Sequence, residues 1–277
     1  MTEPSSVEQQ RCYRHADREA YISCQRCDRL ICPECMRDAS VGFQCPECVA
    51  EGAKSVRQPR TIAGGAVPAR DGAVSMTILG LNVVAFVLQL ATEGTNNSIF
   101  QLGAMQGFAV ADGEYWRLLT AAFLHAGFLH IAFNMYALYL FGPFVERALG
   151  TERYIGAYLT MAIASSVFVY WLTAPGVVTI GASGAVFGLF GLALVLLIRA
   201  GRDVRTLLVL LAINAVISLQ GNISWQGHLG GFVTGVLIGA AIAYAPRQRR
   251  SQALLLTYGL IWAGIMVAVV ARTAQLA

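Results

Sequence analysis

Two residues with complementary chemistry, Ser183 and His228, each lie at the start of a long apolar segment. Residues 181–184 read Gly-Ala-Ser-Gly, and residues 227–231 read Gly-His-Leu-Gly-Gly. Strongly polar side chains are costly inside a membrane, so their presence there favours a functional role. A serine hydroxyl becomes a nucleophile when a base takes its proton, and a histidine within hydrogen-bond reach is the most common base. The pair therefore predicts nucleophilic catalysis, provided that the fold brings the two residues together.

The composition is that of a membrane protein preceded by a polar region. Of 277 residues, 56% are hydrophobic and 13% are charged, whereas a soluble domain carries about 25% charged residues. All seven cysteines lie in the polar region before residue 72, and the long apolar runs follow it. A membrane-spanning helix needs about 20 mostly apolar residues. Seven spans are expected, at roughly 75–91, 127–145, 154–173, 183–199, 204–220, 227–245 and 253–271.

Basic residues predict the orientation of these spans, because cytoplasmic loops are enriched in Lys and Arg. They cluster before the first span and in the loops that follow the second, fourth and sixth spans. The N-terminus is therefore expected in the cytoplasm. Residues 1–4 do not begin a cleavable signal peptide, so the first span is expected to direct insertion into the lipid bilayer. Every basic residue except Lys54 is Arg, and Ala and Gly are abundant, which suggests a GC-rich genome. A bacterial source and a plasma-membrane location are therefore expected.

This orientation places several polar side chains at one depth. Spans two, four and six all run inwards from the external face, and Ser183 and His228 begin spans four and six. His130 lies near the start of span two, and Asn134 follows one helical turn later on the same face. These three spans contain no Asp or Glu, so no carboxylate is available to orient the histidine as in a catalytic triad. Four polar groups from three helices are expected to converge near the external face.

Glycines spaced four residues apart accompany the two candidate residues. One pair, Gly184 and Gly188, follows the serine, and another, Gly231 and Gly235, follows the histidine. Small residues at this spacing let two membrane helices pack backbone to backbone. The glycines therefore predict that spans four and six approach each other closely beside the serine and the histidine.

Together these stretches resemble a rhomboid intramembrane serine protease. The resemblance covers about residues 75–245, in the family's order, and implies an all-α polytopic membrane protein. Its six-helix rhomboid-like core would occupy 73–245, and 246–277 would hold a cytoplasmic loop and a seventh C-terminal helix, as in one family subgroup. The residues that carry the resemblance are Trp116-Arg117, His130-Ile131-Ala132-Phe133-Asn134, Gly181-Ala182-Ser183-Gly184 and His228-Leu229-Gly230-Gly231-Phe232-Val233-Thr234-Gly235.

The resemblance also implies a role for each matching residue. Ser183 resembles the nucleophile and His228 the general base of a two-residue dyad. His130 and Asn134 resemble donors of the oxyanion hole, and Phe187 lies where the family places an aromatic ring against the histidine. The family's structural pair in the long first loop matches Trp116 and Arg117. No cofactor is expected to take part in catalysis.

The reaction implied is cleavage of single-pass transmembrane proteins near the external face. One alternative is a catalytically silent rhomboid-like protein that binds membrane clients, although such a protein has no need of both Ser183 and His228. A second is a metalloprotease that uses His125, His130 and His228, but the sequence lacks a His-Glu-x-x-His pattern. A third alternative is a transporter, which would have ion sites near the bilayer midplane, whereas the polar groups of this chain are expected near one face. Outside the metalloprotease alternative, His125 is interpreted as a loop residue.

The N-terminal region contains four pairs of potential metal ligands, each with two intervening residues. Seven cysteines and one histidine suit two tetrahedral zinc sites, whereas an odd number of cysteines does not suit a set of disulfides. The region buries little core, so two structural zinc ions are expected to supply its folding free energy, with an iron–sulfur site as the alternative. The ligands are Cys12 and His15, Cys24 and Cys27, Cys32 and Cys35, and Cys45 and Cys48.

The ligand spacing is similar to that of a B-box-type zinc finger. That resemblance implies interleaved sites, with the first and third pairs on one zinc and the second and fourth on the other; sequential pairing stays open. Residues 1–52 are expected to form this cytoplasmic domain, followed by a flexible linker at 53–72. A cytoplasmic protein partner is expected, and nucleic acid is not, because a basic stripe and a recognition helix are both lacking.

Overall fold

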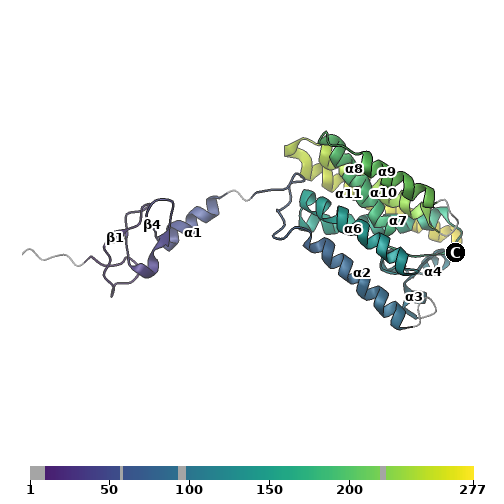
Figure 1. Ribbon diagram of the computed structural model, residues 1–277, viewed down its shortest axis with the longest axis horizontal. Coiled ribbons are helices and arrows are strands. Elements are labelled where there is room, and N and C mark those ends of the chain that lie inside the picture. Colours follow the sequence, from purple (N-terminus) through teal and green to yellow (C-terminus); the bar gives the residue numbers. More distant parts are fainter. Residues whose placement is uncertain (1–9, 57–58, 93–97, 219–222) are drawn as a thin grey trace, which may run out of the picture. The chain divides into compact units, whose positions relative to one another are not determined.

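The computed structural model describes residues 10–56, 59–92, 98–218 and 223–277. The chain divides into two compact units, Met1–Pro59 and Arg60–Ala277 (Figure 1). Each unit is described by itself below.

The N-terminal unit is built from short elements around its cysteines. Strand β1 (Ile22–Ser23) pairs antiparallel with β2 (Leu30–Ile31), and β3 (Arg37–Asp38) pairs antiparallel with β4 (Phe43–Gln44). The 3-10 helix η1 (Pro33–Cys35) and helix α1 (Pro46–Ser55) complete the unit. Among the described residues of this unit, the buried apolar ones are cysteines, Ala20 and Ile31. Such a core is too small to stabilise the unit through apolar burial alone.

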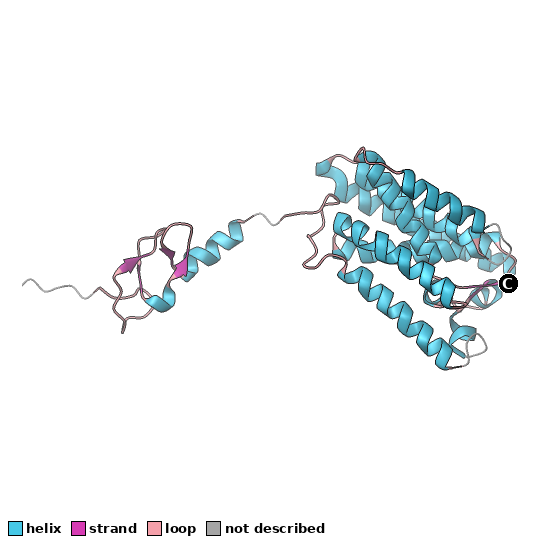
Figure 2. Cartoon of the chain, viewed as in Figure 1, coloured by secondary structure: helices cyan, strands magenta, loops and turns pink. Residues whose placement is uncertain are grey.

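The second unit is a bundle of helices (Figure 2). Its long elements are α2 (Ala73–Ala91), α6 (Phe128–Leu149), α7 (Thr151–Leu172), α8 (Ser183–Arg199), α9 (Arg205–Ser218), α10 (Trp225–Tyr244) and α11 (Arg250–Leu276), the last preceded by the 3-10 helix η4 (Arg247–Arg249). Five are long and apolar enough to cross a membrane, namely α2, α6, α7, α10 and the segment that contains α11. Helices α8 and α9 are apolar but shorter. The prediction of a mostly helical, multi-pass membrane protein is therefore confirmed.

Helix α8 lies at the centre of the bundle. It contributes a nearly continuous buried run, including Leu189 and Leu192, and packs against α6, α7 and α10. Helix α2 packs on α6, and α11 packs on α7 and α10. Two large aromatic residues of α7, Tyr154 and Tyr158, are buried in the same core cluster. The helix that begins at Ser183 is therefore enclosed by protein along most of its length.

The closest helix contact in this core is between α8 and α10, and glycine makes it possible. A Cβ atom at Gly231 would overlap the carbonyl oxygen of Gly184, and one at Gly235 would overlap that of Gly188. Backbone therefore lies against backbone at both levels. The four glycines that the sequence singled out all lie in this contact.

Helix α6 extends beyond its expected end and gains a buried carboxylate. The expected span stopped at residue 145, whereas the helix reaches Leu149 and includes Glu146, which is fully buried. Its carboxylate accepts hydrogen bonds from the backbone N–H groups of Val74 (3.0 Å) and Ser75 (2.9 Å). A carboxylate stabilises the first turn of a helix, where N–H groups lack intrahelical partners. Glu146 thus ties the start of α2 to α6.

Residues 60–72 lie against the adjoining ends of α6 and α7. The N–H of Ala63, a fully buried residue, donates to the carbonyl of Ala148 (3.2 Å). Thr61 Oγ1 donates to the carbonyl of Leu149 (3.1 Å), and Arg153 donates to the carbonyl of Ala63. The expected linker at 53–72 therefore includes the end of α1 and this packed segment; its residues 57–58 lie outside the described residues.

The connection between α2 and α6 contains short elements that end beside α8. They are α3 (Ser98–Gly103), β5 (Met105–Gln106), α4 (Gly107–Ala111), α5 (Arg117–Thr120) and the 3-10 helix η3 (Ala121–Phe123). Strand β5 pairs with β6 (Val178–Thr179) in the loop that leads into α8. The unit is therefore not purely helical. The sequence did not predict these strands, because two residues per strand are too few to give a recognisable alternating pattern.

Candidate active site

Ser183 and His228 lie within hydrogen-bonding distance of each other. His228 Nε2 and Ser183 Oγ are 2.8 Å apart, although 45 residues separate them in the chain. His228 is buried and Ser183 is partly exposed. The distance lies inside the range required of a base that takes a proton from a hydroxyl group.

The ends of two helices hold this pair in place. Ser183 is the first residue of α8 and follows Gly181, whose φ of +126° favours glycine. The Gly181 N–H donates to the carbonyl of Ala121 (2.8 Å), which joins this turn to η3. His228 lies in the first turn of α10, where Ser224 Oγ caps the helix by accepting from the N–H of Gly227. Both side chains therefore project from rigid helix starts.

An aromatic ring orients the histidine. The rings of Phe187 and His228 are stacked, with centroids 4.0 Å apart and planes inclined by 7°. Phe187 lies one turn after Ser183 on α8, so a single helix carries both the hydroxyl and the ring that supports the imidazole. Stacking can therefore restrict the imidazole in the way that an acidic residue does in a triad.

A second histidine faces the same space. His130 Nδ1 accepts a hydrogen bond from the N–H of Ala126 (3.4 Å), so in the neutral ring the proton lies on Nε2. A Cβ atom added to Gly181 would lie 2.7 Å from His130 Nε2 and 3.8 Å from Ser183 Oγ. Because Gly181 has no side chain, the His130 ring lies against its backbone, and Nε2 and Ser183 Oγ both lie within 4 Å of the same point. The Nε2–H donor is therefore close to the place where an oxyanion forms when Ser183 Oγ attacks a carbonyl group.

Asn134 lies one helical turn after His130 on α6 and is buried. Its Nδ2 donates to the carbonyl of His130 (3.0 Å). An amide nitrogen carries two hydrogens, and this bond uses one of them. Asn134 therefore lies next to His130 on α6 and has a second donor hydrogen that this bond does not use.

Trp116 and Arg117 brace the loop before α6. Arg117 is buried, and its guanidinium contacts Glu114 Oε2 (2.6 Å from Nε) and the carbonyl of Ala104 (2.6 Å). Trp116 is exposed, and its Nε1 donates to the carbonyl of Leu102 (2.9 Å). Both side chains tie the start of α5 to the segment before β5. This geometry suits a structural role.

His125 lies in the loop between η3 and α6, as expected, and its side chain is fully buried. Its ring lies edge-on to that of His130, with centroids 5.1 Å apart. Among the described residues, those close enough together to share a metal ion form two N-terminal groups, and neither group includes His125, His130 or His228. This arrangement argues against the metalloprotease alternative.

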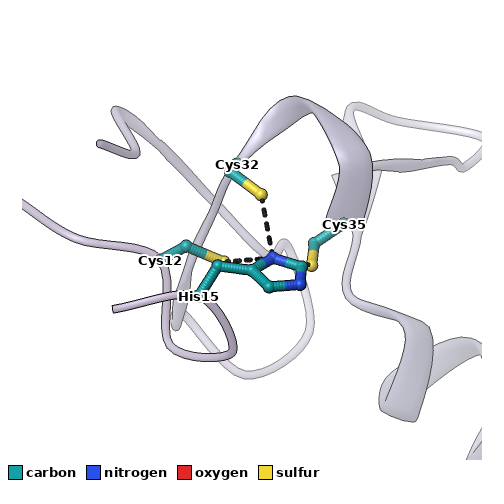
Figure 3. A group of neighbouring side chains, drawn as sticks. All are labelled: Cys12, His15, Cys32 and Cys35. Carbon is teal, nitrogen blue, oxygen red and sulfur yellow. Dashed lines mark hydrogen bonds between the residues drawn. The ribbon is translucent and has the colours of Figure 1, made fainter. Parts of the chain in front are cut away.

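The first N-terminal ligand group consists of Cys12, His15, Cys32 and Cys35 (Figure 3). His15 Nδ1 lies 4.0, 3.3 and 3.4 Å from the sulfurs of Cys12, Cys32 and Cys35. A ring nitrogen carries at most one hydrogen, so it cannot donate to three thiols. Ligand bonds of about 2.3 Å to sulfur and 2.0–2.1 Å to nitrogen place tetrahedral ligands roughly 3.6 Å apart. The spacing therefore fits a shared metal ion.

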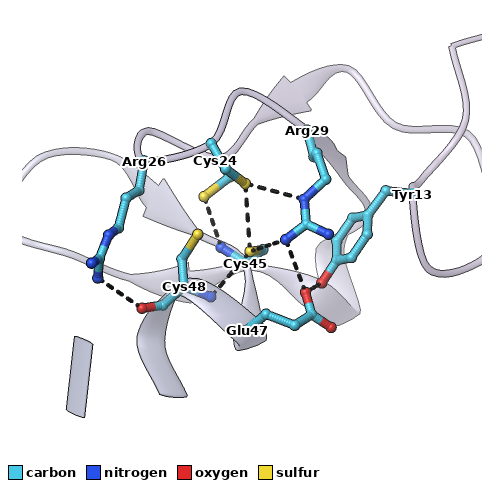
Figure 4. A network of polar contacts seen from close by, with 8 residues as sticks. Tyr13, Cys24, Arg26, Arg29, Cys45, Glu47 and Cys48 are labelled. Carbon is cyan, nitrogen blue, oxygen red and sulfur yellow. Dashed lines mark hydrogen bonds and ion pairs between the residues drawn. The ribbon is translucent and has the colours of Figure 1, made fainter. Parts of the chain in front are cut away.

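The second group consists of Cys24, Cys27, Cys45 and Cys48, so the two groups are interleaved along the chain. Cys27 Sγ and Cys45 Sγ are 3.8 Å apart, the edge expected of a zinc–thiolate tetrahedron. Arg29 lies over this group and donates to Cys27 Sγ (3.2 Å) and Cys45 Sγ (3.6 Å) (Figure 4). It also stacks on Tyr13 and pairs with Glu47. The guanidinium offsets negative charge on the thiolates.

Hydrogen bonds lower the pKa of some thiols of the second group and raise the pKa of another. The side chain of Arg29 lowers the pKa of Cys27. Burial opposes ionisation of Cys24, but backbone N–H donors, led by that of Cys45, lower its pKa to about 6. The Cys48 thiol donates a hydrogen bond to the Cys45 side chain, and this bond, together with burial, raises the pKa of Cys48 to about 12. A divalent cation stabilises the thiolate form of Cys48 and so offsets the hydrogen bond and the burial that keep it protonated. Four thiolates and a metal ion therefore suit each other.

Comparison with known proteins agrees with this geometry. Residues 112–245 match the family model described as "Rhomboid domain". YdcA of Bacillus subtilis is 37% identical over 147 residues, which are 51% of this chain and 73% of that protein. The rhomboid protease GluP of the same organism is 36% identical over 176 residues, or 59% of this chain and 34% of GluP. RHOMBOID-like protein 5 of Arabidopsis thaliana is 31% identical over 155 residues, or 53% of this chain and 50% of that protein.

The matched region contains every polar residue of the candidate active site and excludes the N-terminal ligand groups. This chain thus spans most of YdcA but only about a third of GluP. The resemblance expected from the sequence is confirmed for the helical unit: the chain belongs to the rhomboid family of serine proteases.

Proposed function

We propose that the protein is an intramembrane endopeptidase in which Ser183 is the nucleophile and His228 is the general base. The observation that carries this proposal is the 2.8 Å contact between Ser183 Oγ and His228 Nε2. The stacked Phe187 ring supports it, because the imidazole must stay oriented without a carboxylate.

The residues supply each proton transfer of acyl transfer. His228 Nε2 takes the hydroxyl proton as Ser183 Oγ attacks the substrate carbonyl. The oxyanion then accepts hydrogen bonds from His130 Nε2, Asn134 Nδ2 and the N–H of Ser183 at the start of α8. His228 returns the proton to the leaving amine and then activates a water molecule that hydrolyses the acyl-enzyme.

The length of α8 supports a site below the membrane surface. At 1.5 Å per residue, its 17 residues span about 26 Å, which is less than the roughly 30 Å of the hydrocarbon core. With Arg199 at the cytoplasmic boundary, Ser183 lies several ångströms inside the external one. Water and a locally unwound substrate helix must reach this depth. We therefore propose single-pass transmembrane proteins as substrates, cleaved near the external face, in a protein whose N-terminus is cytoplasmic.

The test is cleavage of a panel of single-pass substrates by the purified full chain in liposomes. Ser183→Ala should give no product, whereas Ser55→Ala, which changes a serine of α1, should cleave like the original protein. Equal cleavage by Ser183→Ala would overturn the dyad. Absence of cleavage by every folded variant, together with stable capture of the same substrates, would favour the client-binding alternative.

We also propose that each N-terminal ligand group holds one structural zinc ion in a B-box-type module. The interleaved grouping and the ligand spacing support this assignment, and all four positions of each tetrahedron are filled by protein. Such an ion folds the module and has no open position for catalysis. The module is then free to bind a cytoplasmic protein. Elemental analysis should give two zinc ions per chain; sulfide and iron in place of zinc would identify an iron–sulfur site instead.

A further inference from the structure

A buried glutamine on α2 holds the backbone just before α6. Gln89 Nε2 donates to the carbonyl of His125 (2.8 Å), and Gln89 Oε1 accepts from the N–H of the same residue (3.2 Å). Gln89 is almost fully buried, and 36 residues separate the two partners in the chain. One side chain thus fixes both polar groups of one residue in the turn between η3 and α6.

The turn held by Gln89 controls a proton in the candidate active site. The residue after His125 is Ala126, whose N–H donates to His130 Nδ1 (3.4 Å). A neutral imidazole has one protonated nitrogen, and a donor aimed at Nδ1 places that proton on Nε2. His130 Nε2 lies beside Gly181, and it and Ser183 Oγ are both within 4 Å of one point there. Two hydrogen-bonded links, joined by the peptide bond between His125 and Ala126, therefore connect Gln89 to His130.

We propose that Gln89 is a positioning residue for the oxyanion hole. It holds the Ala126 N–H against His130 Nδ1 and so keeps the His130 ring in the tautomer and orientation that present Nε2–H to the oxyanion. This inference rests on the proposed function, in which His130 stabilises the oxyanion. The hydrogen bonds of Gln89 with His125 join it to the backbone, so its proposed effect on the reaction passes through His130.

The same helix provides a matched control. Asn82 is also a fully buried amide on α2, but its Nδ2 donates to the carbonyl of Ile78 within the helix (2.8 Å). Asn82→Leu and Gln89→Leu both remove a buried amide from α2, yet only the second releases the turn before α6. Effects shared by the two variants therefore report on packing, and effects of Gln89→Leu alone report on positioning.

The direct test is the nitrogen-15 NMR spectrum of histidine-labelled full chain, which has only four histidines. We expect His130 in the original protein and in Asn82→Leu to carry its proton on Nε2, and we expect Gln89→Leu to show a mixture of tautomers. An unchanged His130 tautomer in Gln89→Leu, or the same change in Asn82→Leu, would overturn the proposal. If Gln89→Leu does not fold, Gln89→Glu, which keeps an acceptor and loses the donor, is compared in the same way.

Kinetics supply an independent readout through a double-mutant cycle. Gln89→Leu should lower kcat about 10-fold or more with KM within about 2-fold, since a misplaced donor loses part of the roughly 10²–10³-fold that one oxyanion donor contributes. In a His130→Ala background, the same change should have less than about 2-fold further effect. An equal loss in both backgrounds would show that Gln89 does not act through His130. Cleavage by Ser183→Ala would instead overturn the proposed function, and the NMR result would still decide the role of Gln89.

Discussion

Substitution of Gly231 by alanine should separate the two helices that carry the serine and the histidine. The added Cβ would overlap the carbonyl oxygen of Gly184, whereas an ordinary carbon–oxygen contact needs roughly 3.3 Å. The overlap is with backbone, so no side chain can rotate away, and α10 must move from α8 by on the order of 1 Å. The distance from His228 Nε2 to Ser183 Oγ would then grow from 2.8 Å to about 4 Å, beyond the reach of a general base.

Both stability and activity should fall. Overpacking a tight core typically costs about 1–3 kcal/mol, and general-base catalysis contributes about 10²–10⁴-fold to the rate. We expect Gly231→Ala to lower the thermal unfolding temperature in detergent and to lower kcat by at least about 100-fold. The assay is cleavage of a transmembrane substrate under conditions in which each variant remains folded.

Gly264→Ala is the matched control, because this glycine of α11 has no atom within 4 Å of its added Cβ. Alanine favours helix over glycine by about 0.5–1 kcal/mol, so the control should be as stable as the original protein or slightly more stable, with unchanged kcat. If Gly231→Ala matched Gly264→Ala in both measurements, the close approach of α8 and α10 would not be what holds the dyad together.

Three further changes test other contacts. Phe187→Leu should lower kcat about 3- to 10-fold with little change in KM, since an aromatic pair contributes about 0.5–1.5 kcal/mol. Phe187→Tyr should retain activity, and an unchanged kcat in Phe187→Leu would exclude a role for the stacked ring. Glu146→Gln should lower the free energy of unfolding by about 2–4 kcal/mol, measured by denaturation in mixed micelles, because the carboxylate accepts two backbone hydrogen bonds of α2 while buried; a loss below about 0.5 kcal/mol would contradict this. Zinc should dissociate as the pH falls, because protons compete with the metal ion for the thiolates. With the pKa of Cys24 near 6 and that of Cys48 raised well above neutrality, zinc affinity measured with a chromogenic chelator should decline throughout the range from pH 8 to pH 5. Retention of zinc that does not depend on pH would contradict a thiolate site.

The sequence was sufficient to predict that Ser183 and His228 lie together, because their placement depends on position along a helix. Ser183 and His228 each begin an apolar segment, and the antiparallel order of the segments places such starts at one level. The glycine spacing then indicated which two helices approach each other. These inferences needed only the helical period and the length of a membrane span.

The remaining contacts depend on side chains that meet across long stretches of sequence. Glu146 lay just outside an expected span, and nothing local shows that it caps α2 from another helix. Gln89 reads as one polar residue in an apolar helix, and its contact with His125 requires the turn before α6 to be placed. For both Glu146 and Gln89, the sequence shows a polar residue inside or beside an expected span, but it does not indicate which residue forms the hydrogen bond. The pairing of β5 with β6 gave no signal, because each strand has two residues.

The central claim is that Ser183 is a nucleophile activated by His228. The most direct test is reaction of the full chain with a fluorophosphonate, which modifies an activated serine, followed by mass spectrometry of the peptides. We predict one adduct, on Ser183, formed by the original protein and slowed at least about 100-fold in His228→Ala. Modification of another serine, or an equal rate in His228→Ala, would contradict the account.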